Sequence, residues 1–298
     1  MSLQISGPFN KKISKQQGDS VGYLTHCILY SALQKTCKTH LFYIFLFGIL
    51  ATTSQAQVNI EQYRASDGIS GNIGLSLGGA SGNSDFFTGG GAANVTIAKP
   101  TYTVLLLGDG LLGFRGGETF SNQGLAHARY TWTKPPRFQP EAFTQADYAR
   151  PRELTFRYLL GGGIRTLLFE DTTYTLTVGN GLMFEHERLN TVAGDTHPAR
   201  TSTIRANNYA NIQIRQKATI TITAYYQFIP NNAKDFRFLL HTQIASRVAG
   251  PLQQVTTIRY RRDSRPPLTV KKNDFTIGTS FALSFGDKKK KTEDTSDK

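Results

Sequence analysis

Cysteine is nearly absent from this chain of 298 residues. The two that occur, Cys27 and Cys37, both lie in residues 1–56, a segment that we expect to be removed as a leader. Residues 57–298 contain none. The exported part of the protein therefore has neither a disulfide framework nor a cysteine metal site.

Long apolar runs are equally scarce, and the one that stands out covers residues 41–51. A membrane-spanning helix needs about 20 apolar residues, so this run is too short to serve as an anchor. Lys35 and Lys38 precede it, and the small residues Ser54 and Ala56 follow it. A basic flank, a short apolar core and small residues at the cleavage site are typical of a secretory signal peptide. We expect cleavage after Ala56.

Motifs of catalysis and metal binding are missing as well. Residues 74–78 fit the letters Gly-x-Ser-x-Gly, but they lie inside the predicted strand 66–79 and not at a strand-to-helix elbow, and the sequence has no His-Glu-x-x-His pattern. His186 stands between Glu185 and Glu187, but adjacent residues of a strand point to opposite faces, which removes the simplest metal site. The glycines at 161–163 are followed by no lysine–serine pair, so they form no phosphate loop. We therefore predict no enzyme, no cofactor and no metal ligands.

The charge of the chain is strongly basic, with a formal net charge of +13. Residues 1–56 hold five lysines and one aspartate, so the remainder carries about +9. The arginines of that remainder are spread through strand-like segments and form no basic helix or patch. Together with the export signal, this distribution argues against a nucleic acid as partner.

What the chain does contain is an alternation with a period of two residues, clearest in residues 275–285. Bulky side chains, from Phe275 to the aromatic Phe285, alternate with small or polar ones such as Gly278 and Ser280. Successive side chains of a strand point to opposite faces, so this strand has one apolar face and one polar face. Strands of outer-membrane barrels, with lipid outside and a polar lumen inside, show this pattern.

The same pattern predicts a β structure throughout residues 57–285. We expect twelve strands, at 66–79, 86–98, 101–111, 123–133, 141–149, 155–168, 173–187, 202–216, 218–229, 235–247, 253–262 and 273–285. The connections between them alternate, with mostly tight links such as 216–217 in one set and longer polar ones such as 112–122 and 188–201 in the other. An even-stranded barrel with both ends in the periplasm has such connections.

The predicted fold class is therefore all-β: a single antiparallel, up-and-down transmembrane β-barrel of about twelve strands over residues 57–285. The closing strand, 273–285, should pair with the one near Ile69–Leu77. Residues 286–298 are polar and rich in charge, and we predict a disordered charged tail. Aromatic residues near the strand ends, such as Tyr130, Trp132 and Phe236, are expected to form girdles at the membrane interfaces.

Charged residues of the predicted strands share the parity that faces the lumen, because a charge facing lipid costs about 2–4 kcal/mol at mid-depth. These lumen-facing candidates are Arg129, Glu141, Asp147, Arg157, Arg165, Glu185, Glu187, Arg205, Arg215, Arg237, Arg247, Arg259 and Arg261. Arginine forks pair with carboxylates and brace neighbouring strands, so the favoured interpretation is a structural ladder of ion pairs. Arginines outnumber the acids, so the alternative is an anion-preferring pore. Any open volume should lie beside the last strand, whose inner face is small and uncharged.

Two alternatives of other classes stay open from the residues alone. A soluble, lipocalin-like binding barrel would place the apolar residues inside and arginines such as Arg237 and Arg247 outside. A lipid-modifying barrel enzyme would have to use His127, His186, His197 or His241 beside a nucleophile. The number of copies in an assembly is not determined by the sequence.

Three segments of the chain carry a resemblance to a known family. They are the His127–Tyr130 stretch, the Glu141–Gln145 stretch and the Arg157–Arg165 stretch with its three glycines. The opening residues 68–84 and the Glu185–Glu187 stretch add to it. In this order the segments resemble the signature of domain of unknown function 481, the YdiY-like, salt-induced outer-membrane proteins, over about residues 66–285.

The resemblance implies an integral barrel of the Gram-negative outer membrane without an established molecular activity. It supplies no catalytic residues to carry over to this chain. The expected partners are outer-membrane lipid and, during insertion, the barrel-assembly machinery. Two features depart from the family's pattern: a longer leader, and a charged tail that follows the aromatic Phe285.

Overall fold

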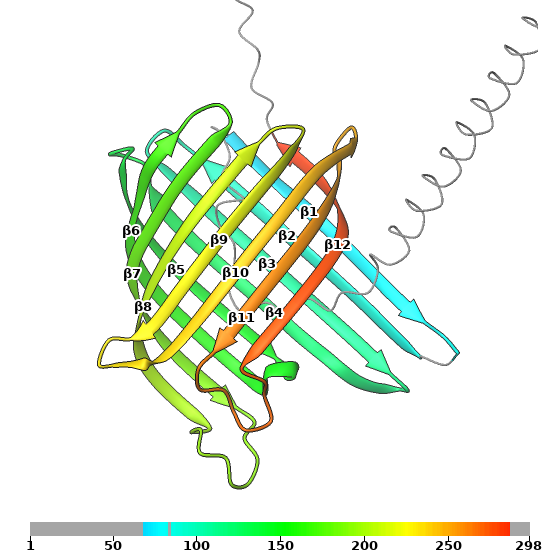
Figure 1. Ribbon diagram of the computed structural model, residues 1–298. Coiled ribbons are helices and arrows are strands. Elements are labelled where there is room, and N and C mark those ends of the chain that lie inside the picture. Colours follow the sequence, from blue (N-terminus) through cyan, green and yellow to red (C-terminus); the bar gives the residue numbers. More distant parts are fainter. Residues whose placement is uncertain (1–67, 83–84, 287–298) are drawn as a thin grey trace, which may run out of the picture. The chain divides into compact units, whose positions relative to one another are not determined.

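A computed structural model describes residues 68–82 and 85–286 of the chain as a twelve-stranded antiparallel barrel (Figure 1). Its strands are β1 (Gly68–Ala80), β2 (Phe86–Ala98), β3 (Tyr102–Arg115), β4 (Glu118–Trp132), β5 (Phe138–Ala149), β6 (Leu154–Glu170), β7 (Tyr174–Leu189), β8 (Arg200–Arg215), β9 (Ala218–Ile229), β10 (Asn232–Ala249), β11 (Leu252–Asp263) and β12 (Asn273–Gly286). A short 3₁₀ turn, η2 (Arg150–Arg152), joins β5 to β6. The predicted leader at 1–56 and all but the first residue of the predicted tail lie outside the described residues.

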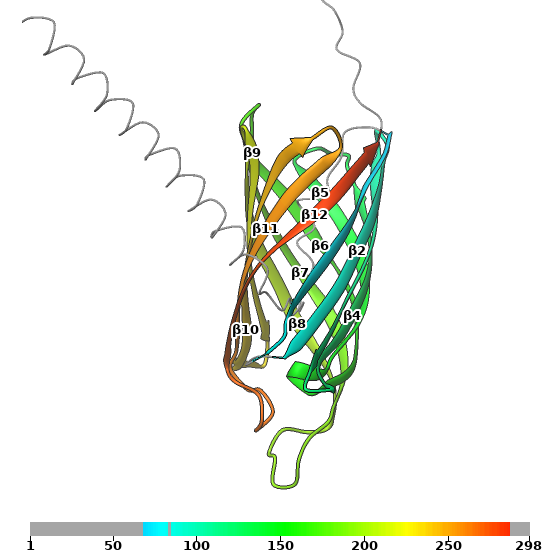
Figure 2. The same ribbon diagram turned by 90° about the vertical axis from the view of Figure 1, so that its right-hand side faces the viewer.

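The barrel closes by pairing of its first strand with its last, as predicted. Each strand pairs with its neighbours along the chain, and β1 then pairs antiparallel with β12, from Ser70 opposite Gly286 to Leu75 opposite Phe281. Figure 2 shows the two strands side by side at this seam. Full closure leaves no unpaired sheet edge, which is the condition for a sheet to cross a lipid bilayer.

One predicted loop is wrong. The sequence analysis placed a long connection at 112–122, whereas β3 continues to Arg115 and β4 begins at Glu118. The turn between them consists of Gly116 and Gly117, whose φ angles are 56° and 83°. Two consecutive residues with positive φ make a tight hairpin turn that matches the twist of the flanking strands, and glycine adopts these angles without steric cost.

The connections between strands lie at two ends of the barrel, which we call the turn end and the loop end. The turn end holds the links 99–101, 133–137, 171–173, 216–217 and 250–251, together with the start of β1 and the end of β12. The loop end holds the links 81–85, 116–117, 150–153, 190–199, 230–231 and 264–272. In Figure 1 the loop end is at the bottom.

The exterior of the barrel is apolar over its middle. Leu75 and Leu77 of β1 are 70% and 72% exposed, and Leu182 of β7 is 56% exposed. Such exposure of large apolar side chains from strand after strand is stabilised by lipid and not by water. Among the described residues, no helix has the length and apolar character needed to cross a membrane.

Aromatic rings gather on the exterior near both ends of the strands, as predicted. At the turn end Tyr130 packs against Tyr102 and Trp132, with ring centroids 5.4 and 4.5 Å apart. Near the loop end Tyr226 lies 5.8 Å from Phe236. Amphipathic rings at two levels match the two water–lipid interfaces of a membrane. The fold is therefore a transmembrane β-barrel.

A candidate site in the lumen

Glu185 of β7 lies at the centre of the charged residues inside the barrel, and its side chain is fully buried. Its carboxylate accepts hydrogen bonds from Arg205 Nε of the adjacent β8 at 2.8 Å and from Arg237 of β10 at 2.6 Å. A terminal nitrogen of Arg157, on β6, lies 3.8 Å away. A buried carboxylate is tolerated only when it is paired, and three guanidinium groups surround this one.

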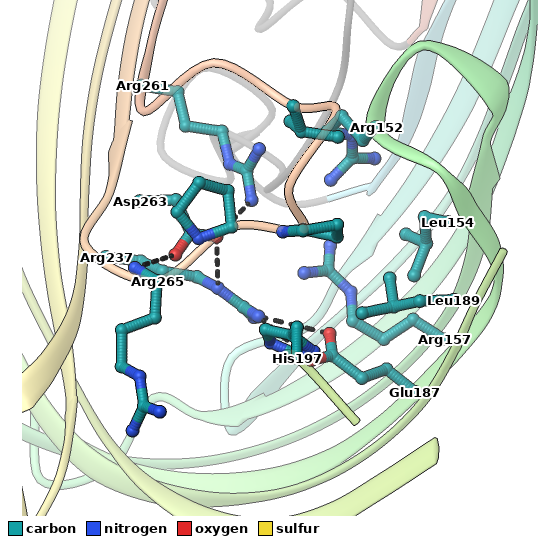
Figure 3. A pocket seen from close by; sticks show the side chains of 13 residues that line it. Arg152, Leu154, Arg157, Glu187, Leu189, His197, Arg237, Arg261, Asp263 and Arg265 are labelled. Carbon is teal, nitrogen blue, oxygen red and sulfur yellow. Dashed lines mark hydrogen bonds and ion pairs between the residues drawn. The ribbon is translucent and has the colours of Figure 1, made fainter. Parts of the chain in front are cut away.

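Arg237 of β10 connects β7 and β11 at this level. Besides Glu185, it donates to Glu187 of β7 at 3.1 Å and, through Nε, to Asp263 at the end of β11 at 3.0 Å. Figure 3 shows its guanidinium between Asp263 and Glu187. Because β8 and β9 separate β10 from β7, the contacts between Arg237 and β7 cross the interior instead of following the sheet.

Further pairs extend this arrangement around the wall. Asp147 of β5 accepts two hydrogen bonds from Arg157, at 3.0 and 2.9 Å, and one from Arg152 of η2 at 3.3 Å. Arg205 also pairs with Asp235 at 2.9 Å, and Arg261 pairs with Asp263 at 2.8 Å. We call the whole set the loop-end network: Asp147, Arg152, Arg157, Glu185, Glu187, Arg205, Asp235, Arg237, Arg261 and Asp263.

The loop-end network is balanced in charge. Its five carboxylates face five arginines, every one of them in a direct ion pair. Sequence reasoning missed Arg152, Asp235 and Asp263. Arg152 lies in a connection, and Asp235 lies near the beginning of β10. Asp263 is the last residue of β11 and fell one residue beyond the predicted strand 253–262, although it has the same parity as Arg259 and Arg261. The sequence analysis counted more arginines than acids among the residues predicted to face the lumen. That surplus of arginine does not lie in the loop-end network.

The middle of the lumen also contains an apolar cluster, which the sequence analysis did not foresee. Its members are Leu105, Leu107, Leu125, Tyr209, Tyr225 and Leu239, all buried. Tyr209 of β8 donates from its hydroxyl to Glu141 of β5 at 3.3 Å, and Glu141 pairs with Arg129 at 2.7 Å. Long side chains from opposite walls thus meet across the barrel axis.

Gly179 of β7 makes room for this contact. A Cβ at Gly179 would overlap the ring of Tyr209, and one at Gly161 would overlap the ring of Phe143. These two strand glycines mark close approaches of aromatic rings to the backbone.

Two connections cover the loop-end network from outside. Asp195, in the link after β7, accepts the backbone N–H of Leu268, in the link after β11, at 2.9 Å. It also accepts the N–H of His197 at 2.8 Å, and these two hydrogen bonds lower the pKa of its carboxyl group. His197 and Pro267, from the same two links, line a cavity of about 20 Å³ above the network. The loop end of the lumen is narrow and covered.

The turn end of the lumen is open by comparison. A cavity of about 360 Å³, which we call the vestibule, is bounded by luminal residues of β1, β2 and β8–β12. Ser280 and Ala282 of β12 belong to its lining. The predicted open volume beside the last strand is thus present, and it exists because the side chains there are small.

The remaining lumen-facing candidates do not join the loop-end network. Arg165 donates to Gln139 at 2.8 Å near the turn end. Arg215 and Arg259 line the vestibule, while Arg247 is exposed near the 250–251 turn. Within the described residues neither Arg215 nor Arg247 has an ion-pair partner. Arg215 and Arg247 both lie at the turn end of the barrel.

The four histidines considered for catalysis lie apart. His127 contacts Gln145 at 3.2 Å, His241 lines the vestibule, and His197 lies in a loop. His186 is hydrogen bonded to Ser202 at 2.8 Å on the exterior, and no described carboxylate orients it. The part of the chain that the structure describes contains no group of three or more histidine, cysteine, aspartate or glutamate residues placed to hold a metal.

Comparison with known proteins identifies one family. The family described as "Protein of unknown function, DUF481" matches residues 73–285. No curated protein matches the chain.

Solved barrels resemble the fold at very low identity. The translocator domain of the autotransporter NalP from Neisseria meningitidis has 9% identity and a TM-score of 0.42, covering 74% of this chain and 87% of that one. The NanC porin has 7% identity and a TM-score of 0.40, covering 72% and 97%. The KdgM porin has 8% identity and a TM-score of 0.36, covering 73% and 98%. At these values, what those proteins transport says nothing about this chain.

Proposed function

The chain belongs to the DUF481 family, and we propose that it is an integral outer-membrane barrel whose lumen is closed to diffusing solutes in the folded state. The full burial of Glu185 between arginines from three strands carries this proposal. Its carboxylate is closed off from solvent, and the arginines that surround it come from strands on either side of β7.

The orientation follows from the two ends of the barrel. Outer-membrane barrels have short turns and both chain ends on the periplasmic side, with the longer loops outside the cell. The turn end would then face the periplasm and the loop end the exterior. Export through the signal peptide at 1–56, insertion by the barrel-assembly machinery and contact with outer-membrane lipid belong to the same proposal.

The balanced charge of the loop-end network supports a bracing role over a permanently open pore. A conducting, anion-selective constriction needs a surplus of cationic groups with water between them. Here every arginine of the network is paired with a carboxylate within 3.3 Å. The protein is accordingly proposed to be neither an enzyme nor a general porin.

Planar-bilayer recording with the purified, refolded protein tests closure. The wild type should insert without conductance steps. A double variant, Glu185→Ser with Arg237→Ser, removes both members of a pair that crosses the lumen and should produce steps. Arg247→Ser, which removes an exposed arginine, should stay silent. Heat-modifiable migration on gels shows that each variant is folded.

Two results would contradict the proposal. Sustained steps from the wild type would show that the lumen is open, and recovery of the protein as a soluble periplasmic monomer would remove the membrane barrel itself. An anion-preferring pore is the second candidate, favoured by the two arginines of the vestibule. If the lumen prefers anions, the current through the double variant in a salt gradient should reverse at the potential set by the anion gradient.

A further inference from the structure

The vestibule has an unusual charge for a polar cavity of about 360 Å³. Its lining includes Arg215, Arg259 and His241 but no aspartate or glutamate. Asp109, the acid whose charge acts on Arg259, is not part of the lining. The lining of the cavity therefore contains cationic and neutral side chains, whereas the loop-end network contains carboxylates as well.

His241 is the second observation that points to a ligand. Its side chain is only 7% exposed, and among the described residues neither ring nitrogen has a hydrogen-bond partner. The side-chain oxygen of Gln243, two residues further along the luminal face of β10, is also buried without a partner. Buried polar atoms in folded proteins are nearly always hydrogen bonded, so an unpartnered pair beside a cavity marks a place where a bound molecule supplies the bonds.

The remaining lining is rich in neutral donors and acceptors. Amide side chains such as Gln213 and Gln253 and hydroxyl groups such as Thr221 and Ser280 face the same space. Arginine binds carboxylate and phosphate oxygens, while amides and hydroxyls match the hydroxyl groups of a ligand. The volume is within the range of small-molecule sites, roughly 300–1,000 Å³.

We propose that the vestibule is a binding site for a small organic anion that carries hydroxyl groups. Arg259 and Arg215 bind its acidic group, and His241 and Gln243 bind its neutral oxygens. Arg215 is exposed beside the 216–217 turn, so the site opens at the turn end. In the proposed orientation the anion enters from the periplasm, and a closed loop end retains it on that side. This binding site is independent of the proposed closure of the lumen, because the cavity is present whether or not the barrel conducts ions.

Isothermal titration calorimetry on the folded barrel in a zwitterionic detergent tests this site. Gluconate, with one carboxylate and a chain of hydroxyl groups, is the probe, and sorbitol is its uncharged counterpart. Gluconate should bind saturably and sorbitol should not. Arg259→Gln should weaken gluconate binding by roughly 10-fold or more, because a hydrogen bond to a charged group is lost. His241→Leu should weaken it by a smaller factor.

Arg247→Gln is the matched control, because it removes the same charge at the same end of the barrel outside the lining. It should bind gluconate like the wild type. If Arg259→Gln does not fold, Arg215→Gln at the exposed mouth takes its place. The proposal is overturned if folded wild type shows no saturable heat with gluconate, if sorbitol binds equally well, or if the lining variants and Arg247→Gln lose affinity to the same extent. None of these results depends on conductance.

Discussion

Arg237 is the residue whose replacement should destabilise the barrel most clearly. It pairs with Glu185, Glu187 and Asp263, which belong to two strands on different sides of the lumen. Arg237→Met keeps most of the length of the side chain and removes the charge. The effect therefore measures the ion pairs more than the packing of the stem.

The structure indicates which carboxylate loses most of its pairing when Arg237 is replaced. Glu185 keeps Arg205 at 2.8 Å, and Asp263 keeps Arg261 at 2.8 Å. Glu187 keeps the hydrogen bond from the hydroxyl of Thr201 at 3.3 Å, which is an uncharged donor. Removing one partner of a buried ion pair costs about 3–5 kcal/mol, because the other charge is left uncompensated. We expect a loss of that size in the free energy of unfolding, with Glu187 as its main source.

A double-mutant cycle tests this assignment. Glu187→Gln alone should cost about 1–3 kcal/mol, because Arg237 retains two other carboxylates. Combined with Arg237→Met, it should cost less than the sum of the two single changes, by about 0.5–3 kcal/mol. The uncompensated charge that makes Arg237→Met costly is absent from the double variant.

Urea unfolding of the barrel in phospholipid vesicles is a suitable assay. Trp132, the single tryptophan of the chain, is 45% exposed on the exterior at the turn end, so its emission reports on removal from the membrane. The midpoint and the slope together give the free energy of unfolding. Arg247→Gln, at an exposed site, should stay within about 0.5 kcal/mol of the wild type. If Arg237→Met and Arg247→Gln have the same midpoint, or if the cycle is additive, the ion-pair reasoning is refuted.

Three further predictions follow from other parts of the barrel. Asp195→Ala should speed hydrogen exchange of the Leu268 amide, because the acceptor of that amide is removed. In the wild type, protection of the Leu268 amide should be complete above the ordinary aspartate pKa of about 3.9. It should be lost as the pH falls through the lowered pKa of Asp195. Leu75→Arg should destabilise the barrel in vesicles by about 2–4 kcal/mol in urea titrations, because the side chain faces lipid. Gly179→Ala should cost about 1–3 kcal/mol in the same titrations, because the added Cβ overlaps a ring.

Each of these has a control inside the chain. For the pH effect, amides within the strand ladder should keep their protection through the same range. Ser280→Arg places the same charge in the vestibule, and should cost less than Leu75→Arg; an equal cost would contradict the parity of the strands. Gly108→Ala meets no atom closer than 3.7 Å, so it should cost less than Gly179→Ala. A Leu268 amide that exchanges at the same rate with and without Asp195 would contradict the contact between the two links.

Much of the architecture could be predicted from local patterns. The two-residue alternation in 275–285 identifies a strand, its faces and its surroundings at once, because the geometry of a strand leaves only two directions for a side chain. Errors occurred where the pattern weakens. In residues 110–117 the adjacent Leu111 and Leu112 and four glycines interrupt the two-residue alternation, so β3 was ended four residues early.

The sequence by itself predicted an up-and-down membrane barrel of about twelve strands, and it predicted most of the charges that lie inside, although Arg152, Asp235 and Asp263 were missed. It did not determine which charges meet. Arg237 and Glu185 are 52 residues apart, and Tyr209 and Glu141 are 68 apart, so each contact depends on the register of several strand pairs together. Only the tertiary structure separated a neutral, covered network at the loop end from a basic vestibule at the turn end. The physical reason is that parity selects the face of the sheet, whereas closure of the barrel sets the height at which opposite walls meet.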